Sequence, residues 1–331
     1  MSRTAFGGRS MGEAADVLYD MTTDDKCFVV GTFSGAMTVA KQGLLLCEMI
    51  DRGMLNAVVS TGALMTHGLV ESYGMTHFKN DPSYSDEELF AAGYNRVYDT
   101  LELEKNLDDL EVFVQQALSL ADGNGPLSSM DLCKRLGKRL HDQGGARGIL
   151  VSAYNKGVPV YIPAFTDSEL GLDFAIFNKT REIEGLEPVH FDPFLDLEDY
   201  TSRIAFAEKL GIFTIGGGVP RNWAQQVGPY LDILEKRLGH RYGCQKRFTY
   251  GVRICPEPVH FGGLSGCTYS EGISWGKFTP PSMGGKFAEV IADATVVWPV
   301  LLKAVIERLE KHGWRHGAAA YHSSSSTKEK V

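Results

Sequence analysis

The sequence lacks the features of secreted and membrane proteins. Its six cysteines are scattered and form no Cys-x-x-Cys pair, so a disulfide scaffold and a structural zinc site are not expected. The N-terminus has no apolar signal segment, and no uninterrupted apolar stretch approaches the length of a membrane span. We therefore expect a cytoplasmic protein with reduced thiols and no membrane partner.

Common ligand-binding patterns are missing too. The Gly-x-x-x-x-Gly-Lys-Ser/Thr phosphate loop does not occur, and neither does the ordinary Gly-x-Gly-x-x-Gly dinucleotide fingerprint. His67 and His77 are ten residues apart and not on one helical face, while His312 and His316 have helical spacing but no third ligand nearby. The sequence therefore predicts no metal site.

The chain has fewer basic than acidic residues. The chain has 33 Lys and Arg against 41 Asp and Glu, a formal net charge of −8, which disfavours a nucleic-acid partner and suits a cationic ligand. Its 331 residues show no internal repeat and no linker. We predict an N-terminal arm over 1–25, a single domain over 26–312 and a disordered tail over 313–331.

Short apolar runs alternate with helical patterns along the chain. This alternation predicts an α/β, Rossmann-like fold: a doubly wound, mostly parallel sheet with helices on both faces. The expected strands cover 27–31, 56–60, 158–162, 212–215 and 248–254. An irregular segment is expected over 80–97 and a long helix, interrupted by Pro299, over 287–311. Ser128 and Asp131 predict a capping box.

Two expected strand-to-helix turns are rich in glycine, Gly31–Gly35 and Gly216–Gly218. Such turns present unpaired backbone N–H groups and a positive helix end to an anion. Glycine is also the default residue wherever a tight turn needs positive φ. Spacing alone leaves both interpretations open.

One lysine stands out in the segment Glu271-Gly-Ile-Ser-Trp-Gly-Lys277. An amine nucleophile must be neutral, and burial against the indole of Trp275 would lower the pKa of Lys277 enough to favour that form. Trp275 would also form a flat wall for an alkyl chain, and Glu271 would bind an ammonium group or relay a proton. The alternatives are a surface lysine, a core tryptophan and a solvated turn carboxylate.

This lysine segment resembles that of the deoxyhypusine synthase family, and four other segments follow in the family's order. They are Thr61-Gly62, Val158–Gly171, Ile215–Val219 and Ala292–Pro299. The resemblance implies NAD as cofactor and a homotetramer with sites shared between subunits. The positions that match NAD contacts of the family are Ser34, Thr61, Asp167, Gly217, Gly218, Ala292 and Asp293.

The resemblance also implies a reaction. An amine such as spermidine is oxidised to an imine, its aminobutyl group passes to Lys277 as a Schiff base, and an acceptor amine then takes it. The acceptor would be a lysine of a protein or, as in homospermidine synthesis, a small diamine. Two alternatives remain open: an NAD-dependent amine dehydrogenase that releases its imine, and a non-catalytic NAD-binding subunit.

Several positions depart from the family pattern. Carboxylates of the family are replaced around Phe261 and Leu264, and Leu172 stands where an aspartate is expected, with Asp173 displaced by one residue. Asn222 replaces a histidine after the triple glycine, and we expect Asn222, Asp173 and Trp275 to contact the substrate. With fewer anionic partners a polyamine should bind more weakly or in another register.

Overall fold

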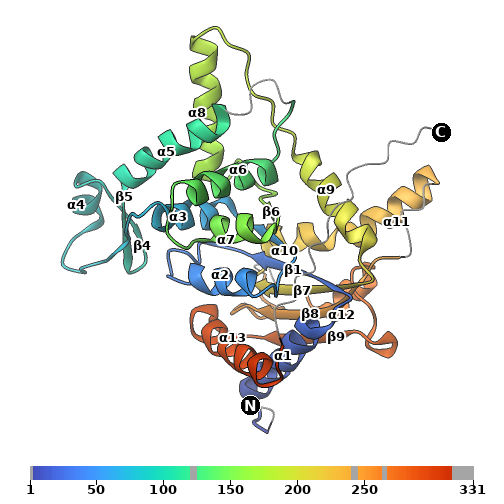
Figure 1. Cartoon of the computed structure of the whole chain (residues 1–331). Helices are drawn as coiled ribbons and strands as arrows, with labels where there is room; N and C mark the ends of the chain where they lie inside the picture. Colours follow the sequence, from blue (N-terminus) through green and yellow to red (C-terminus); the bar gives the residue numbers. More distant parts are fainter. Residues whose placement is uncertain (1–2, 120–124, 240–244, 263–266, 315–331) are drawn as a thin grey trace.

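A parallel sheet lies at the centre of the computed structural model, which describes residues 3–119, 125–239, 245–262 and 267–314 (Figure 1). Six strands follow the order β6-β2-β1-β7-β8-β9, and all neighbours are parallel. They are β1 (Cys27–Phe33), β2 (Ala57–Ser60), β6 (Val160–Tyr161), β7 (Lys209–Ile215), β8 (Phe248–Ile254) and β9 (Lys286–Val290). Each predicted strand overlaps one of these.

Helices cover both faces of the sheet because strand side chains alternate between two buried clusters. In β1, Phe28 and Val30 enter one cluster, whereas Val29 and Phe33 enter the other. The first cluster is completed by α9 (Pro193–Phe206), α10 (Gly218–Gln225), α11 (Val227–Leu238) and α12 (Tyr269–Ser274). The second is completed by α1 (Gly7–Thr23), α2 (Gly43–Asp51), α3 (Gly62–Ser72), α5 (Glu104–Ser119), α6 (Ser129–Asp142), α7 (Ile149–Lys156), α8 (Glu169–Ile183) and α13 (Ala294–Lys311). The doubly wound fold is confirmed.

The segment 80–97, predicted to be irregular, is structured, so that prediction was wrong. It contains α4 (Asp86–Ala91) and β4 (Tyr94–Val97), and β4 joins β3 (Phe78–Lys79) and β5 (Thr100–Leu103) in an antiparallel sheet. Most of β4 is exposed, so its sequence carries no apolar alternation. We call β3, β4 and β5 the small sheet; it lies beside α3, apart from the central sheet (Figure 1).

The single helix predicted over 287–311 is divided into a strand and a helix, which corrects that prediction. The first part pairs with β8 as β9, and Asp293 then caps α13 by accepting a hydrogen bond from the Thr295 N–H at 2.8 Å. Pro299 has no backbone N–H and cannot donate the helical hydrogen bond to the Thr295 carbonyl four residues earlier. The Gln42 side-chain amide donates to that carbonyl at 2.7 Å instead, so α13 continues past the proline.

The N-terminal end of the chain differs from its predicted organisation. Helix α1 falls inside the predicted arm over 1–25, yet it packs against β9, β8 and α13 and therefore belongs to the core. Most of the predicted tail, residues 315–331, lies outside the described residues. Among the helices that the structure describes, none combines the length and apolarity needed to cross a bilayer. The capping box of Ser128 and Asp131 is confirmed at the start of α6.

Candidate functional site

The carboxyl ends of β1 and β7 mark a reversal in strand order. From β1 the sheet grows through β2 to β6 on one side, whereas β7, β8 and β9 extend the other side. Open α/β sheets bind ligands at such a point, outside the carboxyl ends of the strands. The two glycine-rich turns meet there, because the Ser34 hydroxyl donates to the Gly217 carbonyl and accepts from the Gly217 N–H at 3.2 Å.

A cavity of about 200 Å³, which we call the strand-end pocket, opens at this edge. It is lined by Ser34, Ser60, Thr61, Gly62, Ala164, Asp167, Gly218, Val219 and Pro220. The structure thus brings together Ser34, Thr61, Asp167 and Gly218, which were predicted to contact NAD, and Gly217 adjoins them through Ser34. Ser60 and Gly62 were missed, although their place beside Thr61 at a strand end was a usable signal.

The first turns of α3 and α10 form part of the pocket wall. Thr61 caps α3 by accepting from the Leu64 N–H at 3.3 Å, and its hydroxyl donates to the Gly35 carbonyl at 2.6 Å. A Cβ on Gly62 would lie 2.0 Å from the Ser168 hydroxyl oxygen, so only glycine allows this approach. First-turn N–H groups lack partners within their helix and can bind an anion.

A second cavity of about 330 Å³, the lysine cavity, shares Gly218 and Val219 with the strand-end pocket. Its remaining lining residues are Arg221, Asn222, Gln225, Cys267 and Lys277. The Lys277 carbonyl accepts from the N–H of Phe248 in β8 at 3.0 Å, which anchors the lysine to the central sheet. Its ammonium nitrogen donates to Asn222 Oδ1 at 2.9 Å, and the residue is only 7% exposed.

Burial lowers the pKa of Lys277, and the nearby Arg221 cation lowers it further, while Cys267 and Glu271 oppose the shift. Trp275 does not supply the burial that we expected from it. It ends α12, is 63% exposed and is not among the residues that line the lysine cavity. Contacts with α10 and Cys267 enclose the lysine instead, and Glu271 lies exposed on α12.

Arg221 is the main residue that sequence reasoning missed. It is 3% exposed, donates from Nη1 to the Cys267 carbonyl at 2.6 Å and lies over the Tyr269 ring. Its Nε and Nη2, like Nε2 of Gln225, are buried without a hydrogen-bond partner among the described residues. Such donors can hold a carboxylate or carbonyl oxygen. No motif marks this arginine, because a lone charge on a helix ordinarily indicates a solvated position.

Three predicted site residues lie elsewhere. Asp173 is buried in α8, where burial, then Glu169 and Glu111, raise its pKa to about 7. Ala292 follows β9 and Asp293 caps α13. None of the three lines either cavity within the described residues.

Sequence comparison finds a family and relatives that match most of this chain. A family model described as deoxyhypusine synthase matches residues 1–305. The "Probable deoxyhypusine synthase 2" of Methanosarcina acetivorans is 32% identical over 312 residues, 93% of this chain and 85% of that protein. Its namesake in Archaeoglobus fulgidus is 30% identical over 306 residues, 92% and 96% of the two chains.

The fold is shared with a solved structure. The crystal structure of a candidate deoxyhypusine synthase from Entamoeba histolytica superimposes with a TM-score of 0.61 at 15% identity, over 92% of this chain and 90% of that one. At 15% identity this similarity shows a shared fold only. The family is shown by the family model and the sequence relatives, which match most of the chain. The chain therefore belongs to the deoxyhypusine synthase family.

Proposed function

We propose that this protein is an NAD-dependent aminoalkyl transferase in which Lys277 carries the alkylamine as an imine. The observation that carries the proposal is the buried Lys277 amine, bonded to Asn222 in a cavity that adjoins the strand-end pocket. Family membership supports aminobutyl transfer as the reaction class. The donor would be a polyamine or another small amine, and the acceptor a protein lysine or a small diamine.

The strand-end pocket suits part of an NAD molecule. The hydroxyls of Ser34 and Thr61 and the carboxylate of Asp167 are groups that bind ribose hydroxyls, and the first turns of α3 and α10 suit phosphate oxygens. When bound, NAD would take a hydride from the carbon beside the donor nitrogen and return it at the end. The shared wall at Gly218 and Val219 would bring that carbon toward Lys277.

Lys277 would form the covalent intermediate. Its neutral amine adds to the electrophilic carbon of the oxidised donor, the bond from that carbon to the departing amine breaks, and a C=N bond to Nζ remains. Nζ keeps one proton in a protonated imine, and the proton that it loses leaves with the departing amine. An acceptor amine reverses this exchange and frees Lys277. Burial of the lysine keeps water, which would hydrolyse the imine, away from it.

The charge of the lysine cavity bears on the substrate. Arg221 is a cation and Lys277 an amine, and no carboxylate is among the lining residues that the structure describes. Leu172 and Phe261, two of the positions that depart from the family pattern, are exposed, and Leu264 lies outside the described residues. We therefore include among the candidate donors an amine that carries a carboxylate, because the free donors of Arg221 would bind it.

The test is borohydride trapping with NAD and spermidine, putrescine, agmatine or ornithine, followed by mass spectrometry of the Lys277 peptide. We expect an aminoalkyl adduct on Lys277 whose mass identifies the donor. Lys277→Arg, which keeps the charge but forms no imine, should give no adduct, and the exposed Lys156 should stay unmodified. Free NADH accumulating without an adduct would support an amine dehydrogenase instead, and NAD binding without turnover a non-catalytic subunit.

We also propose that the working unit is a homotetramer whose sites are completed by a second copy of the chain. The exposed Trp275 supports this, since it leaves an indole open to a partner beside the lysine segment. Val296 and Val300, one turn apart on α13, are likewise exposed at 66% and 53%. A partner covering Trp275 would further shield the lysine segment from water.

A further inference from the structure

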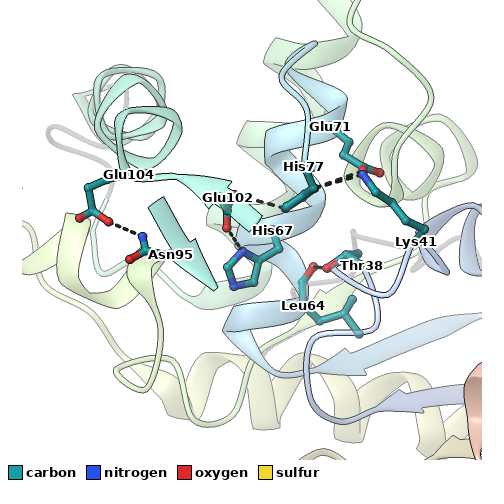
Figure 2. Close-up of polar contacts among 9 residues, drawn as sticks. All are labelled: Thr38, Lys41, Leu64, His67, Glu71, His77, Asn95, Glu102 and Glu104. Atoms are coloured by element: carbon teal, nitrogen blue, oxygen red, sulfur yellow. Dashed lines mark hydrogen bonds and ion pairs between the residues drawn. The ribbon is translucent and has the colours of Figure 1, made fainter. Parts of the chain in front are cut away.

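Three potential metal ligands meet outside the site described above. His67 of α3, His77 just before β3 and Glu102 of β5 each offer a ligand atom, and these atoms all lie within 4.8 Å of one another. Dashed lines in Figure 2 join Glu102 to both histidines. The side chains of His77 and Glu102 are 0% and 3% exposed, and that of His67 is 20% exposed. Ten residues separate the histidines, so sequence spacing gave no sign of the cluster.

Two atoms of this cluster are buried without a hydrogen bond. His77 Nε2 and Glu102 Oε1 lie 3.3 Å apart, yet neither has a hydrogen-bond partner among the described residues. The other oxygen of Glu102 is bonded to His67 Nδ1 at 2.5 Å. The contact between His77 Nε2 and Glu102 Oε1 is an ion pair, and a buried polar atom without a hydrogen bond costs about 1–3 kcal/mol, so a bound ion would be favoured here.

A second carboxylate fixes the orientation of His77. Its Nδ1 lies 3.2 Å from Glu71 Oε1, and Glu71 is ion-paired with Lys41 (Figure 2). Toward Glu71 the Nδ1 of His77 would donate, whereas toward Lys41 Nζ, 3.4 Å away, it would accept. A carboxylate behind the histidine nitrogen that does not bind the ion is the usual support of a metal-ligating histidine.

We propose that His67, His77 and Glu102 bind a divalent transition-metal ion of the zinc class, with a solvent molecule as fourth ligand. Two imidazoles and one carboxylate are a ligand set that zinc accepts. Tetrahedral ligands about 2.0–2.1 Å from zinc are about 3.3 Å apart, which is the separation of His77 Nε2 and Glu102 Oε1. Binding then requires only that His67 Nδ1 separate slightly from Glu102.

The ion would join the small sheet to α3. His67 lies on α3, whose first turn lines the strand-end pocket, whereas His77 and Glu102 flank or belong to the small sheet. Occupancy would therefore restrain the small sheet against the helix that begins at that pocket. This role is structural and does not depend on the proposed transfer reaction.

The test uses the full-length chain without an affinity tag, stripped with a chelator and titrated with Zn²⁺ against a chromophoric chelator. We expect one tightly bound equivalent, confirmed by elemental analysis after desalting, and visible absorption typical of four-coordinate Co²⁺ when cobalt replaces zinc. His67→Gln, at the least buried ligand, should weaken zinc binding at least 100-fold while the far-UV circular dichroism stays unchanged. Glu102→Gln should do the same.

Two control variants separate this site from other ligands. His141→Ala removes a histidine whose ring contacts that of Tyr154, and Cys267→Ser removes the partly exposed thiol of the lysine cavity. Both should bind zinc as the wild-type chain does. Less than 0.1 equivalent of zinc retained by the wild-type chain would overturn the proposal and leave the cluster as a proton-sharing group. Equal affinity in His67→Gln and the wild type would overturn it as well.

Discussion

At the scale of single residues, a charge introduced at Asn222 tests when the Lys277 amine is neutral. Asn222→Asp places a carboxylate about 3 Å from the ammonium and should raise the pKa of Lys277. At a fixed pH below that pKa, the neutral fraction of Lys277 falls about tenfold for each unit by which the pKa rises. The rate of adduct trapping, measured against pH, should shift to higher pH.

Asn222→Ala should shift the same profile in the opposite direction, because it removes the acceptor that stabilises the ammonium. Gln226→Glu is the matched control for added charge, since Gln226 is exposed one turn further along the chain and lines neither cavity. Profiles that coincide in Asn222→Asp and the wild type would show that Lys277 is not the titrating nucleophile.

Asp173 gives a residue-scale prediction for stability. Its pKa is raised to about 7, above the unfolded value near 3.9, so the folded state favours the protonated acid. The resulting penalty is absent below about pH 4, grows as pH rises from about 4 to 7 and is complete above it. At pH 8, Asp173→Asn should therefore increase the free energy of unfolding by on the order of 2–4 kcal/mol and unfold at a higher denaturant concentration. At pH 4 the substitution should increase the free energy of unfolding only slightly.

Denaturant unfolding at several pH values checks this prediction for Asp173. The exposed Asp25→Asn variant should show no such growth with pH. A gain from Asp173→Asn that is the same at pH 4 and pH 8 would mean that its carboxyl does not titrate in this window.

At the scale of elements, the close contact between the start of α3 and the loop before α8 shapes the strand-end pocket. Gly62→Ala would place a methyl 2.0 Å from Ser168 Oγ and 2.3 Å from its Cβ, so α3 must move. We expect at least tenfold weaker NAD binding, measured as a smaller thermal shift at saturating NAD. Ser168→Gly in the same chain removes both clashing atoms and should restore binding.

The control for this element is Gly7→Ala, whose added methyl meets no atom within 4 Å. It should leave the thermal shift with NAD unchanged. Unaltered NAD binding in Gly62→Ala would place the cofactor outside the strand-end pocket.

At the scale of the whole molecule, the proposed tetramer predicts that activity depends on concentration. If a partner completes each site, trapping per chain should fall as the protein is diluted below the dissociation constant of the assembly. Analytical ultracentrifugation at the same concentrations gives the fraction assembled, and the two curves should coincide. Full activity in a proven monomer would refute shared sites.

The sequence by itself determined five of the six strands of the central sheet and the location of the lysine. Alternation of apolar runs with helical patterns is a local signal, and Phe248–Ile254 was predicted with the bounds that the structure shows. The exposed β4 was missed because it has no apolar alternation, and β9 because it was merged with α13. Local patterns report what a segment buries, and a mostly exposed strand buries little.

Only the tertiary structure decided which side chains meet. It brought Ser34 against Gly217, enclosed Lys277 with Arg221 and left Trp275 at the surface, where sequence reasoning had placed it around the lysine. It also brought together His67, His77 and Glu102, which lie on or beside α3 and the small sheet and are separated in sequence. Burial and charge depend on segments that pack from distant parts of the chain, and no local pattern records that packing.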